Sequence, residues 1–389
     1  MLNFNKSFPT EIWFGEGQIE NLAEAIQKYN GTRVLFTYGG GSIKKNGVYD
    51  DVAEQLDAAG IEFVELAGIQ PNPRISSVRT GIELMKKHDL DFILAVGGGS
   101  VVDASKAMAA GMCYDGDPWD FFLKKAEPEE AMPLGVVLTL AATGTETNPN
   151  CVVSCEDTER KLSLIDPAII PKFSILDPTY TYTVPKWQTL CGGFDVMSHC
   201  FEQYFDQTDG TFLQDRMTEA VIKTCIKYMP IAAEDAKNYE ARAQLLWAST
   251  IGLNGILGVG KTGDWATHKM EHEISAIYDL THGAGLAIVT PRWMEYVLDE
   301  DNVERFYNAA VNIWGVGPDE DEMAVAEKGI QALKEFIKEV ELPSSLKDVD
   351  IDGEKIGEMA EKVVLFGEIG NLKPLESSDV EKILEACVE

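Results

Sequence analysis

The sequence predicts an α/β domain over residues 1–184 followed by an all-helical domain over residues 185–389. At 389 residues the chain is too long for one ordinary hydrophobic core, so two domains are expected. Up to Pro185, short apolar runs alternate with amphipathic stretches; beyond it, long stretches with helical periodicity dominate. We see no internal repeat, low-complexity tract or disordered linker in the sequence.

Strand–turn–helix repetition in the first domain indicates a parallel sheet with right-handed crossovers. The apolar runs predict strands over Arg33–Tyr38, Ile61–Leu66, Asp91–Val96, Pro133–Leu140 and Phe173–Leu176. The amphipathic stretches predict helices over Gly47–Ala59, Ser76–His88 and Val102–Ala110.

The second domain is predicted from the spacing of its apolar residues, which follows the helical period. The expected helices are Gln188–Phe205, Thr211–Tyr228, Tyr239–Leu257, Ala266–Tyr278, Val303–Ile313 and Glu322–Glu339. A last helix opens with Ser378 followed three residues later by Glu381, which is a capping-box pattern.

Composition excludes several classes of partner. The 64 acidic and 33 basic residues give a net charge of -31, which would repel nucleic acids and anionic membranes. No apolar stretch approaches the roughly 20 residues that span a bilayer, and the N-terminus lacks the pattern of a signal peptide. Seven cysteines without a paired spacing are typical of a reducing cytosol, so we expect a cytoplasmic protein.

Two glycine turns follow predicted strands, Gly39–Ser42 after the first and Gly97–Ser100 after the third. A strand that runs through glycines into a helix exposes backbone amides that suit a pyrophosphate. The spacing is not the GxGxxG dinucleotide fingerprint, and a sharp turn without a ligand is the alternative. A third polar segment, Thr139–Asn148, can hold a ribose or an amide ring, or can be ordinary turn chemistry. Lys161 is either a phosphate or ribose contact or a solvated surface lysine.

Four of the five histidines lie in two short segments. Asp195 and His199 are four residues apart, which places both on one helix face. His268 and His272 have the same spacing, and His282 follows ten residues after His272. Imidazole and carboxylate ligands together suit a divalent ion, so the segments predict a metal site. Lys269 stands where a zinc protease of the HExxH type carries its glutamate, which disfavours that class.

These motifs together resemble the iron-containing (group III) alcohol dehydrogenases, and most closely the branch of bacterial NAD(P)H-dependent butanol dehydrogenases and broad-range aldehyde reductases. The resemblance runs nearly end to end and rests on the following segments: Pro9–Gly17, Tyr38–Gly47, Gly97–Asp103, Ala142–Glu146, both histidine segments and Asn371–Leu375.

The resemblance implies roles for particular residues. The family's metal ligands fall on Asp195, His199, His268 and His282, and its substrate-side histidine falls on His272. The family's cofactor contacts fall on Gly39, Gly40, Ser42, Gly98, Gly99, Ser100, Asp103, Thr139, Thr143, Asn148, Lys161 and Tyr180. It also implies the dehydroquinate synthase-like fold, with the active site in the cleft between a nucleotide-binding domain and a helical domain.

The resemblance further implies a function. We expect hydride transfer between a nicotinamide cofactor and short-chain aldehydes or primary alcohols such as butanal and butanol, with a divalent ion as Lewis acid, Fe²⁺ favoured and Zn²⁺ second. NAD-selective relatives carry an aspartate where this chain has Gly39, and Lys44 and Lys45 lie near it in sequence, so NADP(H) is expected over NAD(H). A homodimer is expected. The alternatives are a polyol enzyme of the glycerol dehydrogenase type and a non-redox metal-binding protein that retains the fold.

Overall fold

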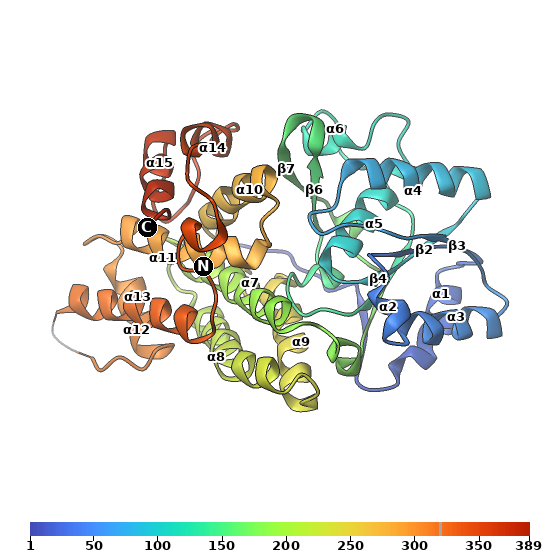
Figure 1. Cartoon of the computed structure of the whole chain (residues 1–389), viewed down its shortest axis with the longest axis horizontal. Coiled ribbons are helices and arrows are strands. Elements are labelled where there is room, and N and C mark those ends of the chain that lie inside the picture. Colours follow the sequence, from blue (N-terminus) through green and yellow to red (C-terminus); the bar gives the residue numbers. More distant parts are fainter. Residues whose placement is uncertain (319–320) are drawn as a thin grey trace. The chain divides into compact units, whose positions relative to one another are not determined.

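The computed structural model describes residues 1–318 and 321–389 and divides them into two compact units (Figure 1). The α/β unit comprises residues 7–185 and 235–250; the helical unit comprises residues 1–6, 186–234 and 251–389. The sequence predicted a single division between residues 184 and 185, and two short segments lie on the other side of it in these units. Residues 1–6 join the helical unit, where Leu2 N donates to Gly260 O over 2.9 Å. Residues 235–250 join the α/β unit, where the Thr250 hydroxyl donates to Glu146 over 2.5 Å.

A six-stranded parallel sheet forms the centre of the α/β unit, in the order β1-β8-β5-β4-β2-β3. Its strands are β1 (Glu11–Phe14), β2 (Arg33–Tyr38), β3 (Glu62–Leu66), β4 (Phe92–Gly97), β5 (Leu134–Leu138) and β8 (Phe173–Leu176). Strands β2, β4, β5 and β8 are nearly continuous apolar runs, because helices cover both faces of a parallel sheet.

Helices pack on opposite faces of this sheet, as Figure 1 shows for α3 and α4. The α/β unit contains α1 (Leu22–Lys28), α2 (Ser42–Lys45), α3 (Val48–Ala58), α4 (Ile75–His88), α5 (Gly99–Met112) and α6 (Trp119–Phe122). Val34 and Phe36 point to the face covered by α1 and α3, whereas Leu35 points to the face covered by α4 and α5. Because successive side chains of a strand point to opposite faces of the sheet, each strand contributes to two separate hydrophobic cores.

An antiparallel hairpin of β6 (Asn150–Cys155) and β7 (Arg160–Ile165) stands apart from the main sheet. Cys151 and Val153 of β6 pack into the α4–α5 core. The hairpin and the edge strand β1 were not predicted from the sequence. Both are short, and their partners lie far away in the chain or across a turn of polar residues.

The helical unit consists of α7 (Lys186–Tyr204), α8 (Phe212–Glu234), α10 (Ala266–Tyr278), α11 (His282–Val297), α12 (Val303–Asn312), α13 (Glu322–Glu339), α14 (Ile356–Val363) and α15 (Ser377–Ala386). Helix α9 (Tyr239–Leu253) runs from the α/β unit into the helical unit. From Thr189 to Tyr204, α7 is buried on all sides and packs against α8 and α11, as expected for a central helix.

Helix α11 was missed at the sequence level although it begins at His282. Pro291 inside the helix and Gly283 and Gly285 in its first turn are poor helix formers, and only tertiary packing overrides them. Within the described residues, no helix combines the length and apolarity needed to cross a lipid bilayer.

Gly283 lets α11 approach α7 closely, and this contact gives the first prediction. A Cβ atom at Gly283 would lie 2.0 Å from the carbonyl oxygen of Cys191, which is backbone and has no rotamer to change. Gly283→Ala should destabilise the protein by about 1–3 kcal/mol. Chemical denaturation measures this, with Gly317→Ala as control, since a Cβ there meets nothing within 4 Å. Equal stability of the two variants would contradict the close approach.

Candidate nucleotide crevice and metal centre

The two glycine turns lie at adjacent strand ends of one sheet edge. Strand β2 pairs with β4 so that Tyr38 lies opposite Val96, and each strand runs into its Gly-Gly-Gly-Ser turn. The chain leaves β2 for β3 on one side and then returns to β4 on the other. The topological switch point therefore lies between β2 and β4, where open α/β sheets form a ligand crevice at the carboxyl ends of the strands.

The second turn supplies a helix N-terminus at this crevice. Gly98 is the N-cap of the 14-residue helix α5, and no side chain caps the helix there. A Cβ at Gly99 would lie 2.6 Å from the Thr143 hydroxyl, and one at Gly98 would lie 3.2 Å from Leu140. These glycines are thus required by packing inside the protein, and the same packing leaves backbone amides of α5 available to an anion. The predicted contact Ser100 stands in the first turn of α5.

Asp103 and Asn148 bind groups inside the protein. The Asp103 carboxylate accepts hydrogen bonds from the Thr145 hydroxyl (2.6 Å) and from Val152 N (3.0 Å). The Asn148 side chain donates to Gly144 O and accepts from Asn150 N. Their side chains hold the loop between β5 and β6, so we expect both to shape the crevice and their role there to be indirect.

Lys106 is the centre of this network and was not recognised in the sequence. It is fully buried on α5, and its ammonium donates to Thr145, to the backbone oxygens of Asn148 and Asn150, and to the Asn148 side chain, over 2.7–3.0 Å. Burial lowers its pKa to about 8, which leaves it charged at neutral pH. Its position three residues after Asp103 is a signal that is visible in retrospect.

The other predicted cofactor contacts have different surroundings. Thr139 directly follows β5, and its backbone N donates to Gly97 O (3.0 Å), which brings it to the second turn. Thr143 meets Gly99 as described above. Lys161 is 5% exposed on β7, so the alternative of a solvated surface lysine is wrong. Tyr180 packs into the α1–α3 core, and its hydroxyl donates to Asp51 (3.0 Å).

The first turn is followed by a charged cluster. Gly40 has open space around it, Gly41 has a left-handed φ of 94°, and Ser42 and Lys44 are exposed on the short helix α2. The Lys44 ammonium lies 2.9 Å from Glu65 of β3. Lys44 is therefore engaged by an acidic partner that sequence reasoning did not identify.

The histidine segments converge in the helical unit. Around Oδ1 of Asp195 lie the nearest nitrogens of His199 (3.5 Å), His268 (3.8 Å) and His282 (3.7 Å), from helices α7, α10 and α11. Donor atoms of Asp195, His268 and His282 lie within 4.8 Å of one another, a spacing that can hold a metal ion. The His199 ring stacks on the His268 ring with centroids 4.6 Å apart.

Three atoms of this cluster that could bind a metal ion have no hydrogen-bond partner among the described residues: Asp195 Oδ1, His199 Nδ1 and His268 Nε2. All three residues are buried. Unpartnered polar atoms in a protein interior cost free energy, and an ion bound among them would offset this cost. The donor set of one carboxylate and three imidazoles therefore fits a divalent ion such as Fe²⁺ or Zn²⁺.

Two buried glutamates hold the other ring nitrogens, and neither was foreseen. His268 Nδ1 lies 2.9 Å from Glu202, which also accepts from Thr267 Oγ1 (2.5 Å) and His268 N (3.0 Å). His282 Nδ1 contacts Glu271, which in turn accepts from the Ser275 hydroxyl. Such carboxylate–histidine pairs fix the ring orientation and the tautomer that presents the opposite nitrogen to a metal.

The charges of the cluster shift its pKa values. Burial raises the pKa of Asp195, but the neighbouring histidines outweigh it and lower the pKa to about 2. Burial lowers the pKa of His199 to about 4, so this ring is neutral at pH 7. Burial also lowers the pKa of His268, but Asp195 and Glu202 together raise it to about 9. The cluster thus combines an ionised carboxylate, a neutral His199 ring and a protonated His268 ring, and a bound metal ion would displace the extra proton of His268.

His272 lies beside this cluster. Its ring centroid is 5.6 Å from that of His282 and 6.5 Å from that of His268. It is half-buried and belongs to a second group, with Glu271 and His282, whose donor atoms also approach one another closely. Its position fits a pocket residue next to the metal centre.

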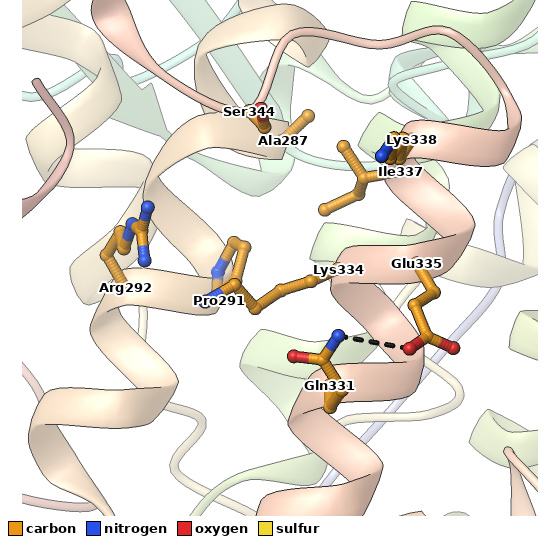
Figure 2. Close-up of a pocket in the computed structure, with 9 residues that line it drawn as sticks. All are labelled: Ala287, Pro291, Arg292, Gln331, Lys334, Glu335, Ile337, Lys338 and Ser344. Atoms are coloured by element: carbon orange, nitrogen blue, oxygen red, sulfur yellow. Dashed lines mark hydrogen bonds between the residues drawn. The ribbon is translucent and has the colours of Figure 1, made fainter. Parts of the chain in front are cut away.

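A separate cavity of about 370 Å³ lies between α11 and α13 and contains none of the predicted site residues (Figure 2). Two of its cations, Arg292 and Lys334, pair with Glu295, and Glu335, which also lines the cavity, accepts a hydrogen bond from Gln331.

Comparison with known proteins agrees with this geometry. Residues 9–178 match the model for iron-containing alcohol dehydrogenase, and residues 189–388 match the C-terminal model of the Fe-containing alcohol dehydrogenase family. The chain belongs to the iron-containing alcohol dehydrogenase family. Membership makes it an oxidoreductase and accounts for the arrangement of an α/β unit and a helical unit.

Several relatives match over nearly the whole chain. The chain is 46% identical to NADH-dependent butanol dehydrogenase A of Clostridium acetobutylicum, over 99% of both proteins. It is 38% identical to the NADPH-dependent aldehyde reductase YqhD of Escherichia coli, over 94% of both. The crystal structure of NADH-dependent butanol dehydrogenase A from Thermotoga maritima superposes with a TM-score of 0.97 at 44% identity, over 100% of this chain and 99% of that one.

The convergence of ligands predicts that His268→Ala loses its metal while the chain stays folded. Removing one of four donors leaves an incomplete shell around a buried carboxylate. Metal content of the purified variant, measured by mass spectrometry, should fall well below that of the wild type. His272→Ala is the control and should keep its metal. Stoichiometric metal in the first variant, or loss in the second, would reverse the assignment.

Glu202→Gln is expected to weaken metal binding about 10–100-fold, because the amide no longer fixes the His268 tautomer. Titration of the metal-free protein with Zn²⁺ measures the affinity. Glu219→Gln is the control, since Glu219 is also buried but binds Tyr204, Arg216 and Asn312 instead of a histidine. An affinity that falls equally in both variants would indicate a general loss of packing.

Proposed function

We propose that this chain catalyses the reversible NAD(P)H-dependent reduction of short-chain aldehydes, such as butanal, to primary alcohols. The observation that carries the proposal is the cluster of Asp195, His199, His268 and His282. Three of its members (Asp195, His199 and His268) are buried, and each has a polar atom without a hydrogen-bond partner among the described residues. The names of the relatives support the substrate class, since the butanol dehydrogenases match over the full length.

The metal centre and the nucleotide crevice have separate roles in the proposed reaction. A divalent ion, Fe²⁺ by preference and Zn²⁺ as second choice, supplies Lewis acidity toward the carbonyl oxygen. Asp195 and the three histidines bind it, while Glu202 and Glu271 orient the rings of His268 and His282. The nicotinamide cofactor supplies the hydride. Gly98, Gly99 and Ser100 bind its pyrophosphate at the N-terminus of α5, and Gly39, Gly40 and Ser42 face its ribose.

His272 relays the proton that the carbonyl oxygen gains on reduction. Its ring is next to His282 and partly exposed, so it can exchange protons with solvent. A residue that acts only in proton transfer leaves metal content unchanged and alters turnover and its pH dependence. His272→Ala separates this role from that of a ligand.

The preference for NADP(H) rests on the missing acid at Gly39 and on Lys45, whose ammonium forms no ion pair with any of the described residues and can meet a 2′-phosphate. Lys44 supports it less, because Glu65 binds its ammonium. Relatives of both kinds exist, named NADH-dependent and NADPH-dependent.

We infer a homodimer from exposed apolar residues in the helical unit. Met1 and Leu2 are more than half exposed, and the N-terminal amine donates to Asp209 O, near Phe212 and Leu213, which are 71% and 67% exposed. A second copy would cover such a patch. Light scattering that gives a monomeric mass would contradict this.

The seven cysteines are all unpaired, which supports a reducing, cytoplasmic environment.

An aldehyde and alcohol panel tests the function. Protein loaded with Fe²⁺ or Zn²⁺ should oxidise NADPH or NADH on addition of butanal, and the loss of nicotinamide absorbance measures the rate. Removal of the metal by a chelator should abolish turnover. Greater kcat/KM for glycerol than for butanol would favour the polyol enzyme, and a bound metal without turnover of either substrate would favour the non-redox alternative.

A further inference from the structure

A charged cluster stands at the carboxyl end of strands β2 and β3. It consists of Tyr38, Lys44, Tyr49 and Glu65, defined here as the Glu65 cluster. Glu65 Oε1 accepts from the Tyr49 hydroxyl (2.6 Å), and Oε2 accepts from the Tyr38 hydroxyl and the Lys44 ammonium (2.9 Å). The Lys44 ammonium also lies over the rings of Tyr49 (4.2 Å) and Tyr38 (5.0 Å). Lys44 is thus restrained by one carboxylate and two aromatic faces.

The cluster lies where a ribose is expected. The pyrophosphate is assigned to the N-terminus of α5, which follows β4, and β2 is the neighbouring strand. In doubly wound sheets the adenosine ribose contacts the end of that neighbouring strand. Tyr38 ends β2, and Leu66, which follows Glu65, pairs with Thr37, so both strands end together.

We propose that Glu65 limits the preference for NADP(H), because it cancels the charge of Lys44 and so lowers the affinity for the 2′-phosphate of NADPH. This inference rests on the proposed function, because it requires a nicotinamide dinucleotide at the crevice. A phosphate that approached the Lys44 ammonium would also approach the carboxylate, and the two anions repel each other. The lysine is therefore a weak phosphate ligand while Glu65 is ionised.

The alternative source of selectivity is Gly39 itself. A Cβ there would lie 3.3 Å from the carbonyl oxygen of Ile69, so an acid at this position needs a backbone shift. Glu65 occupies the same end of the sheet without that strain. It therefore weakens the preference for NADP(H) that follows from the missing acid at Gly39, because it neutralises Lys44.

Glu65→Gln tests the proposal, because the amide keeps the shape and removes the charge. The NADPH-to-NADH ratio of kcat/KM should rise about three- to tenfold, as expected for a partly exposed ion pair. Lys44→Gln should lower the ratio, and the double variant should return it toward the wild-type value, since both charges are then absent.

Glu62→Gln is the matched control. Glu62 is an exposed glutamate at the other end of the same strand, so its replacement removes the same charge from β3 but not from the cluster. Its ratio should stay that of the wild type. A ratio that falls or does not change in Glu65→Gln would overturn the proposal, and a fall would mean that Glu65 positions Lys44 for the phosphate.

A binding measurement separates this proposal from the proposed function. Calorimetry compares adenosine 5′-monophosphate with adenosine 2′,5′-bisphosphate, which differ only in the 2′-phosphate and need neither metal nor substrate. Glu65→Gln should strengthen binding of the bisphosphate alone. Equal effects on both nucleotides would overturn the selectivity role while leaving the nucleotide crevice intact. Absence of binding by either nucleotide in the wild type would contradict the crevice, and with it the inference.

Discussion

The packing of the helical unit depends on the buried, ionised carboxylate of Asp195, whose Oδ1 accepts no hydrogen bond from any residue that the structure describes. Asp195 lies in the stretch of α7 from Thr189 to Tyr204, which is buried on all sides, and three imidazoles from three helices surround that oxygen. A buried charge is tolerated only when other groups compensate it. Positive charge on the histidines or on a metal ion provides this compensation. The packing of α7, α10 and α11 therefore depends on whether the histidines are protonated or a metal ion is bound.

The surrounding residues make that arrangement rigid. Glu202 accepts from both the backbone and the ring of His268, which fixes the first turn of α10 relative to α7. Gly283 allows α11 to touch the backbone of α7, which brings His282 to the same point. The contacts between these helices therefore set the positions of the metal-binding side chains, and a change in the helix packing would move those side chains.

The α/β unit uses a buried charge in a different way. Lys106 on α5 satisfies four oxygen acceptors of residues 145–150, and Asp103 satisfies donors of Thr145 and Val152, so both hold the loop between β5 and β6 and the start of β6. Fully satisfied polar networks specify one conformation of a loop. Here the network fixes Thr143 against Gly99, beside the helix N-terminus that presents its amides to a phosphate. The crevice is thereby shaped by residues that need not touch a ligand.

Local patterns in the sequence determined the strands Arg33–Tyr38 and Phe173–Leu176, the parallel α/β arrangement and the convergence of two histidine segments. The strands and the parallel arrangement follow from periodicity, which neighbouring residues encode, whereas the convergence of the histidine segments was predicted from their residue types and from the resemblance to a family. Only the tertiary structure decided the rest. In the sequence, Glu202 and Glu271 look like ordinary solvated residues of a helix, but in the structure they bind His268 and His282. Lys44, which follows β2, pairs with Glu65 of the neighbouring strand β3. Helix α11 forms against its own proline and glycines because packing on α7 outweighs local propensity. Such partners are distant in sequence, so their pairing depends on how helices and strands meet in space.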